Sequence, residues 1–171
     1  MKYFLYKLKK NNPTANVVLP NGYQLHVWRP SLSITPPKGL RKISTFIWIF
    51  FHYLHIFKNN KFSIIYISYK GNIVSRLLVT PGYFRFPFMD SNDLQIGDVF
   101  TCDSHRGIGL ASHILSYALG LFEKDAQSIF YVVEGTNRIS IKLALSLGFE
   151  LITIGTKKKL FFSFIGYYNF K

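Results

Sequence analysis

Apolar and polar residues alternate with two different periods in the second half of the chain. In residues 109–122 the apolar side chains recur every three or four positions, which predicts a helix. Residues 137–147 predict a second helix, which ends at Gly148. Apolar runs predict four strands, at residues 94–101, 128–133, 149–154 and 160–168. A turn at residues 155–157 is predicted to join the last two. The order strand, helix, strand, helix, strand, strand indicates a mixed α/β sheet.

Fewer regular signals occur in the first half. Residues 62–69 and 72–80 are rich in β-branched and aromatic side chains, and they predict a hairpin with a two-residue turn. Residues 17–29 predict two short extended pieces, broken at residues 20–22. The start of the chain has only a short apolar run at residues 3–6. A signal peptide needs a longer one, so none is expected.

Residues 44–57 are almost wholly apolar and aromatic, and they predict a helix. About 14 apolar residues fall short of the roughly 18 to 20 that span a bilayer, so a transmembrane helix is not expected. The pattern favours a helix buried under the sheet. A helix lying on an anionic membrane surface stays an alternative, because Arg41, Lys42 and Lys58 flank this aromatic stretch.

Composition adds a size limit and a charge asymmetry. The length of 171 residues suits one domain, residues 1–171, and a hydrophobic content of 49% excludes a disordered chain. A single cysteine excludes an intramolecular disulfide. The net charge is +13, and no Asp or Glu precedes Asp90, whereas 13 Lys and Arg do. This split indicates an anionic partner for the first half, or the codon bias of an AT-rich genome.

The segment between the predicted strand at 94–101 and the helix at 109–122 carries the clearest chemical signal. It reads Arg106, Gly107, Ile108, Gly109, Leu110 and Ala111. Small residues let a ligand approach the backbone, and the free N–H groups of a helix start bind phosphate. The lysine of a P-loop and the three glycines of the dinucleotide fingerprint are missing, so the alternatives are another phosphate loop or a plain tight turn.

Two signatures in this region resemble the GNAT superfamily of N-acetyltransferases. Arg106, Gly109 and Ala111 occupy the defined positions of its acyl-CoA loop, Arg/Gln-x-x-Gly-x-Gly/Ala. About 30 residues later, Asn137 and Ser140 precede a helix with a Gly-Phe ending, as in relatives. The resemblance covers roughly residues 93–155.

The resemblance implies a fold, a cofactor and a division of the chain. The fold would be a mixed, mostly antiparallel central sheet with a splayed parallel strand pair and flanking helices. Acetyl-CoA, or another acyl-CoA, would be the co-substrate, and no metal is expected. Residues 1–92 would form mainly the acceptor side, residues 93–155 the acyl-CoA core and residues 156–171 a closing strand. The implied cofactor residues are Val99, Phe100, Thr101, Arg106, Gly107, Ile108, Gly109, Leu110, Ala111, Asn137 and Ser140.

The usual proton-transfer residues of the family are absent from their positions. Ala144 stands where many relatives have a tyrosine, and Gly97 where many have a glutamate. Asp98 is the best substitute, because burial within the strand would make it a useful base. It is alternatively a structural carboxylate. Asp90 and Asp93 are weaker candidates in a neighbouring loop.

Other reactive side chains carry weaker signals. His105 lies beside the glycine turn and is expected to be a loop residue, with cofactor contact as the alternative. His26, His52 and His55 are expected to pack rather than to catalyse. Cys102 lies three residues from His105, but spacing alone does not make it a nucleophile.

The sequence therefore predicts a cytoplasmic acyltransferase, with a peripheral location at the inner face of the membrane as the alternative. It would move an acetyl group to the amine of a small, anionic molecule, with an amino sugar on a nucleotide as one guess. The rivals are a non-catalytic module that binds nucleic acid or anionic membrane, and an acetyltransferase of protein or tRNA. Nucleic acid is the less favoured partner, and the oligomeric state is not predicted.

Overall fold

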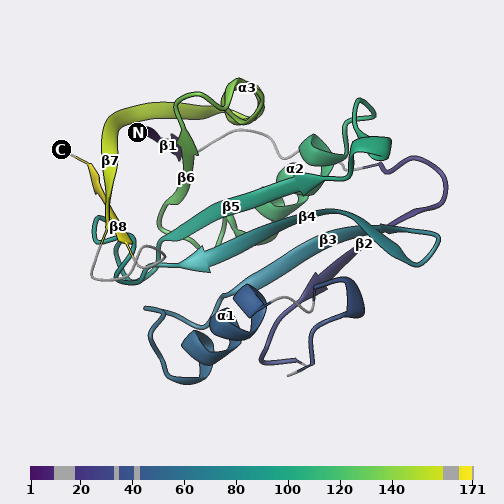
Figure 1. Cartoon of the computed structure of the whole chain (residues 1–171), viewed down its shortest axis with the longest axis horizontal. Helices are drawn as coiled ribbons and strands as arrows, with labels where there is room; N and C mark the ends of the chain where they lie inside the picture. The colour runs from purple at the N-terminus through teal and green to yellow at the C-terminus, as the bar shows by residue number, and fades with distance from the viewer. Residues whose placement is uncertain (10–17, 33–34, 41–42, 160–165, 171) are drawn as a thin grey trace.

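One eight-stranded sheet organises the computed structural model, which describes residues 1–9, 18–32, 35–40, 43–159 and 166–170 (Figure 1). The strand order is β2-β3-β4-β5-β6-β1-β7-β8. β5 and β6 pair in parallel, and the other neighbouring strands pair antiparallel. The predicted mixed, mostly antiparallel sheet is confirmed. The strands are β1 (Lys2–Leu8), β2 (Tyr23–Trp28), β3 (Ser63–Tyr69), β4 (Asn72–Pro81), β5 (Leu94–Thr101), β6 (Ile129–Glu134), β7 (Phe149–Lys159) and β8 (Gly166–Phe170).

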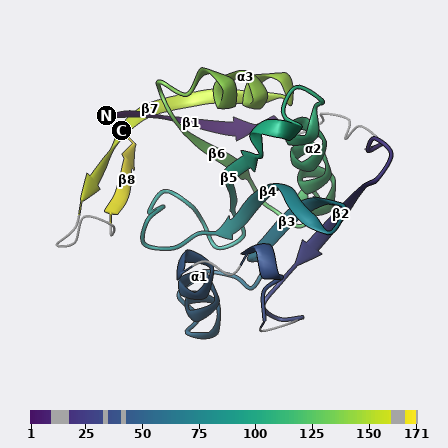
Figure 2. The ribbon, with the colours of Figure 1, turned by 45° about the vertical axis from the view of Figure 1, so that its right-hand side comes forward.

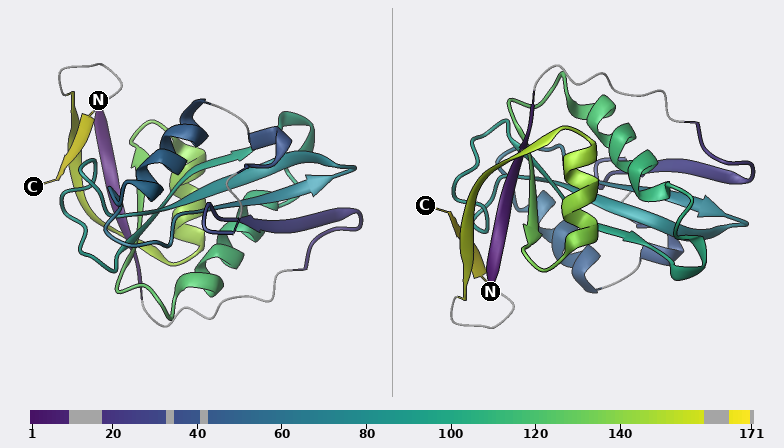
Figure 3. Two further views of the ribbon diagram at one scale, coloured as in Figure 1. Left: turned by 90° about the horizontal axis from the view of Figure 1, so that it is seen from below. Right: turned by 90° about the horizontal axis from the view of Figure 1, so that it is seen from above.

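The helices cover opposite faces of this sheet. α2 and α3 lie on one face and α1 on the other, as the turned views show (Figures 2 and 3). One hydrophobic cluster joins the sheet to α2 and α3, and a second, richer in aromatic rings, joins it to α1 and the loop after β4. The α-helices are α1 (Ile43–Tyr53), α2 (Leu110–Phe122) and α3 (Arg138–Ser146), and the short 3-10 helices are η1 (Lys38–Leu40) and η2 (Asp103–His105). Within the described part of the chain, no helix is both long and apolar enough to cross a membrane.

The predicted helix at residues 44–57 is shorter than expected. α1 ends at Tyr53, and His55 adopts a positive φ of 55°. The N–H of Ile56 donates to the carbonyl of Phe51, which closes the helix with a Schellman-type cap. The aromatic run continues past Tyr53, so the end of the helix has no signal in the hydrophobic pattern.

β1 is a strand that the sequence pattern did not predict. It lies between β6 and β7 and pairs antiparallel with both. Leu5 belongs to the cluster on the α1 face, and Tyr6 to the cluster on the face of α2 and α3. The apolar side chains of β1 face both sides of the sheet, and the exposed Lys2 and Lys7 interrupt them, so the strand shows no simple apolar–polar alternation.

The predicted turn at residues 155–157 is wrong, because these residues lie inside β7. Gly155 pairs with Phe170 of β8, and a Cβ built on Gly155 would collide with the backbone carbonyl oxygen of Asn169. The glycine therefore marks a close approach of two strands rather than a turn. Of the strand predicted at 160–168, residues 160–165 lie outside the described residues and the rest belong to β8.

Gly155→Ala is expected to lower the free energy of unfolding by about 1–3 kcal/mol, because β8 must move away to admit the methyl group. Chemical denaturation of the two proteins measures this difference. Thr156→Ala is the control. Thr156 is the residue next to Gly155 and its side chain is exposed, so its truncation should change the free energy of unfolding by no more than about 0.5 kcal/mol. Equal stability of Gly155→Ala and the wild type would refute the close approach of β7 and β8.

Candidate active site

The parallel strands β5 and β6 separate in the middle of the sheet. They pair over Leu94–Ile96 and residues 129–131, and beyond these positions they keep different partners. β5 continues along β4 as far as Thr101, whereas β6 continues along β1. The predicted splayed pair is therefore present, and it opens a gap in the sheet next to the start of α2 (Figure 1).

A β-bulge lies in β5 at the point where the strands part. Gly97 pairs with Leu78 and Phe100 pairs with Arg76, so Asp98 and Val99 together face a single residue of β4. Asp98 has a positive φ of 48°, a conformation that ordinary residues rarely adopt. A bulge of this kind changes the direction of the side chains that follow it.

The bulge overturns the expected burial of Asp98. Its side chain is 54% exposed, and its Oδ2 lies 3.1 Å from the Nε of Arg76. The prediction assumed a regular strand, in which Asp98 would face inward with Ile96. The carboxylate instead forms an ion pair at the surface of the sheet.

A first cavity of about 500 Å³ lies between the end of β5, the start of α2 and α3. It brings together ten of the eleven predicted cofactor residues, and adds His105, Ile139 and Leu143. The eleventh predicted residue, Ile108, does not line the cavity and is 44% exposed. The predicted residues that line the cavity are Val99, Phe100, Thr101, Arg106, Gly107, Gly109, Leu110, Ala111, Asn137 and Ser140.

The glycine turn presents the start of α2 to this cavity. Gly107 and Gly109 have φ values of 82° and 79°, which explains why glycine occupies both positions. Gly109 is the N-cap of α2 and has no side chain to cap it, so the first N–H groups of the helix, from Leu110 onward, are left for a ligand. These groups and the positive end of the helix dipole favour an anion such as a pyrophosphate.

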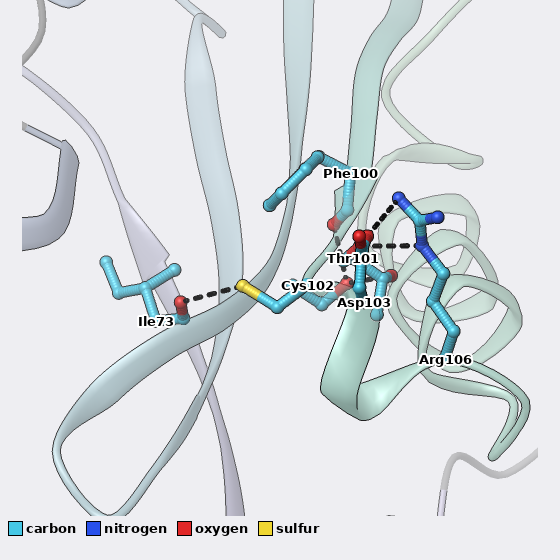
Figure 4. Close-up of polar contacts among 7 residues, drawn as sticks. Ile73, Phe100, Thr101, Cys102, Asp103 and Arg106 are labelled. Carbon is cyan, nitrogen blue, oxygen red and sulfur yellow. Dashed lines mark hydrogen bonds and ion pairs between the residues drawn. The ribbon is translucent and has the colours of Figure 1, made fainter.

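Arg106 fixes the turn to the end of β5 (Figure 4). Its Nε donates to the carbonyl of Thr101 at 3.1 Å, and its Nη2 lies 2.7 Å from Oδ1 of Asp103. The guanidinium thus closes the loop that contains η2. Arg106 also lines the cavity and is 59% exposed, so it adds positive charge to the predicted phosphate site.

Cys102 and His105 do not act as a pair. The sulfur of Cys102 lies 3.8 Å from the carbonyl oxygen of Ile73 (Figure 4). Nδ1 of His105 is 2.8 Å from the hydroxyl of Tyr23, and its ring packs edge-on against Tyr23. His105 lines the first cavity together with the predicted cofactor residues.

Asn137 and Ser140 form the opposite wall at the start of α3. Oδ1 of Asn137 accepts a hydrogen bond from the N–H of Ser140 at 3.0 Å and caps the helix. Below them, burial raises the pKa of Tyr131, and a hydrogen bond with the Ser140 side chain partly opposes this shift. Ala144, in the usual position of the family's tyrosine, is fully buried in the core.

Two smaller cavities, of about 280 and 170 Å³, lie on the α1 face of the sheet. They share four lining residues, Trp48, Leu78, Arg85 and Asp98, and together they are called the α1-side cavity below. Asp98 lines this cavity, while the next residue, Val99, lines the first one. The bulge therefore brings cavities on opposite faces of the sheet to adjacent residues of one strand.

Comparison with known families decides the identity of this arrangement. A family model described as the acetyltransferase (GNAT) family matches residues 27–149, which is more than half of the chain. The chain belongs to the GNAT acetyltransferase family. Members of this family generally use acetyl-CoA, and their chemistry is acyl transfer.

Solved GNAT structures share the fold at low sequence identity. The GCN5-related N-acetyltransferase from Sphaerobacter thermophilus has a TM-score of 0.60 and 17% identity, and the match covers 90% of this chain and 49% of that one. A GCN5-related N-acetyltransferase-like protein from Streptococcus suis has a TM-score of 0.55 and 18% identity, over 89% and 59%. A tandem GNAT protein from the clavulanic acid biosynthesis pathway has a TM-score of 0.60 and 17% identity, over 88% and 50%. The chain thus spans about half to three fifths of these proteins. No curated protein sequence matches the chain.

The side chain of Gln95 occupies the space beside Gly97, which stands at the position of the usual GNAT glutamate. A Cβ on Gly97 would lie 2.7 Å from Nε2 of Gln95, so the buried amide of Gln95 occupies this space. Oε1 of Gln95 accepts a hydrogen bond from the Thr80 hydroxyl at 2.8 Å. At this position the α1-side cavity is lined by the neutral, hydrogen-bonded pair of Gln95 and Thr80, and the carboxylate that lines the cavity belongs to Asp98.

The walls of the α1-side cavity contain residues that the sequence analysis did not select. Arg85 lies with its guanidinium 5.8 Å from the ring of Trp48. Burial raises the pKa of Tyr83 and of Tyr168, and the nearby charge of Arg85 opposes both shifts. One signal was available, since Arg85 is a single cation inside the aromatic stretch 83–88.

The weaker candidates have structural contacts. Oδ2 of Asp93 accepts a hydrogen bond from the N–H of Asp90 at 2.7 Å, within their own loop. Nε2 of His26 lies 2.9 Å from the Ser68 hydroxyl. Burial lowers the pKa of His52, and the charge of His55 lowers it further. Among the described residues, no group of three or more His, Cys, Asp or Glu side chains is placed to hold a metal ion.

Proposed function

We propose that this protein transfers an acetyl group, or another short acyl group, from acyl-CoA to the amine of a small anionic molecule. The observation that carries the proposal is the meeting of the first cavity and the α1-side cavity at the bulge of β5. A donor in one cavity and an acceptor in the other would reach each other through the gap between β5 and β6. Such placement turns a reaction of two molecules into one of a single complex.

The first cavity suits the donor. The start of α2 offers N–H groups for the pyrophosphate, and Arg106 adds charge. Val99 lies where β5 no longer pairs with β6, so its backbone groups on that side would be available to the amide-containing pantetheine arm. Asn137 and Ser140 complete the wall across from the strand.

The reaction itself is a direct transfer. The amine nitrogen of the acceptor attacks the thioester carbonyl, a C–N bond forms, the C–S bond breaks, and the amine loses a proton while the thiolate gains one. Asp98 lines the acceptor side at the bulge, and we assign it the removal of the amine proton. The bulge also frees backbone groups of β5 that would stabilise the developing oxyanion.

The α1-side cavity suits an acceptor with a negative charge. Arg76 and Arg85 line it, and Nε of Arg76 lies 3.1 Å from Oδ2 of Asp98. Trp48 and Tyr83 provide flat aromatic walls, against which a base or a sugar ring packs well. An amino sugar carried on a nucleotide combines a ring, an amine and a pyrophosphate, and it is our first choice. Acyl-CoA is found in the cytoplasm, where we place the reaction.

The deciding experiment measures release of free CoA thiol from acetyl-CoA with a panel of amines. The panel contains nucleotide-linked amino sugars, neutral amino sugars, a basic peptide and tRNA. Turnover with an anionic small molecule supports the proposal. Turnover only with the peptide or tRNA would show that the acceptor is a macromolecule rather than a small anionic amine. Stabilisation by acetyl-CoA without turnover on any amine would favour a non-catalytic binding module.

Arg85→Gln is expected to raise the Michaelis constant for an anionic acceptor about 10- to 100-fold, because a charged hydrogen bond is lost. The Michaelis constant for acetyl-CoA should stay nearly unchanged. Arg29→Gln is the matched control, since Arg29 also packs over an aromatic ring, Phe122, but lies outside both cavities. Equal acceptor constants for the two variants would remove Arg85 from acceptor binding.

A further inference from the structure

α1 carries a row of exposed apolar side chains on the face turned away from the sheet. Thr45 and Ile49 are buried, and Trp48 packs on the aromatic cluster beneath the helix. The opposite side chains recur every three or four positions, so they share one face. We call this face the α1 patch, and its exposed fractions are Ile43 82%, Phe46 52%, Ile47 41%, Phe50 59%, Tyr53 47% and Leu54 55%.

Neighbouring segments extend the patch. The Tyr53 hydroxyl donates to the carbonyl of Pro30 at 3.0 Å, which places the following turn, with Leu32 at 76% exposure, beside the end of α1. The ring of Phe84, 48% exposed, lies 5.7 Å from that of Phe51. Single exposed apolar side chains are ordinary, but a contiguous group from three segments indicates an interaction surface.

The charge around the patch decides among possible occupants. Residues 1–89 contain no Asp or Glu, and Arg41 and Lys42 directly precede Ile43 in the sequence, outside the described residues. Lys38 in η1 is exposed, and Lys58 follows the helix. A second copy docked on the same face would bring equal positive charges together. An anionic lipid surface instead offers negative headgroups to the basic residues and acyl chains to the aromatic ones.

We propose that the α1 patch binds the surface of a membrane that contains anionic lipids. α1 has 11 residues, so it lies along the surface and inserts its outer side chains at the headgroup boundary. The same helix lines the α1-side cavity through Ser44, Thr45 and Trp48. The cavity would therefore lie beside the lipid surface, although the membrane contact does not depend on acyl transfer.

Sedimentation with vesicles tests this contact. Wild-type protein is mixed with vesicles of phosphatidylcholine and phosphatidylglycerol, or of phosphatidylcholine alone, over a series of salt concentrations. We expect binding to the anionic vesicles, weaker binding to the neutral ones, and loss of affinity as salt rises. An absence of binding to anionic vesicles would overturn the proposal.

The double variant Phe46→Gln/Phe50→Gln is expected to lose about tenfold or more in affinity for the anionic vesicles, because two inserted rings are removed without any change in charge. Leu145→Gln/Ile152→Gln is the matched control, since these side chains are 53% and 55% exposed on α3 and β7. Circular dichroism checks that each variant is folded, and because it requires no acyl-CoA it keeps this test separate from the proposed function.

Two further outcomes would reject the membrane contact. Equal binding of the Phe46→Gln/Phe50→Gln variant and its control would mean that charge alone attracts the protein to the vesicles. A wild-type dimer in analytical ultracentrifugation that becomes a monomer in this variant, together with no binding to vesicles, would assign the α1 patch to a second copy of the chain.

Discussion

Gly109→Asp is expected to abolish acetyl-CoA binding while leaving the fold intact. Gly109 is the N-cap of α2 and lines the first cavity. Aspartate is a good N-cap residue, so its carboxylate would accept hydrogen bonds from the N–H groups that the pyrophosphate needs. It would also place a negative charge next to the phosphates. The measurement is the increase in melting temperature on addition of acetyl-CoA, which should disappear.

Gly71→Asp is the matched control for this change. Gly71 lies in the turn between β3 and β4 with a φ of 76°, close to the 79° of Gly109, and a Cβ there meets open space. Both variants therefore carry the same backbone strain and the same added charge, and only one of them touches the cavity. If acetyl-CoA and longer acyl-CoAs do not stabilise even the wild type, the assignment of the first cavity is wrong.

The first cavity is predictable from sequence because its parts are local. Arg106, Gly107 and Gly109 lie within four residues, and the backbone conformation that they allow leaves N–H groups free for an anion such as a phosphate. The start of α2 follows directly from its apolar periodicity. Asn137 needs only its own helix to be placed, since it caps α3 through Ser140. Ten predicted residues therefore meet in one cavity.

The α1-side cavity is not predictable in this way, because its residues come from distant segments. Trp48 of α1, Arg85 of the loop after β4 and Tyr168 of β8 line one cavity only after the sheet has formed. No spacing in the sequence links them. The same holds for β1, whose place between β6 and β7 depends on pairing with residues more than 120 positions away.

The bulge at Asp98 shows a second kind of failure, in which the element is correct and its side-chain direction is wrong. The strand at residues 94–101 was predicted with its observed bounds. Its alternation placed Asp98 inward with Ile96, but the extra residue opposite Leu77 rotates Asp98 to the surface. Register in a sheet is set by cross-strand packing as well as by the local sequence. The candidate base Asp98 is therefore exposed in an ion pair with Arg76, rather than buried as a regular strand would have it.

Asp98→Asn is expected to lower the turnover number about 10²- to 10⁴-fold, the contribution of a general base, and to change the Michaelis constant for acetyl-CoA little. Asparagine keeps an oxygen that can accept from Nε of Arg76, so the contact at 3.1 Å can persist without the charge. A purely structural carboxylate would behave differently, because its replacement would lower stability and spare turnover.

Glu150→Gln is the control for Asp98→Asn. Glu150 also forms an ion pair at 3.1 Å, with Lys9, but it lies on β7 outside both cavities. Its turnover should equal that of the wild type. The pH–rate profile supplies the second readout, since removal of the base should remove the limb on which turnover rises with pH. A folded Asp98→Asn variant with wild-type turnover and an unchanged profile would exclude Asp98, and the amine proton would then have to leave through water.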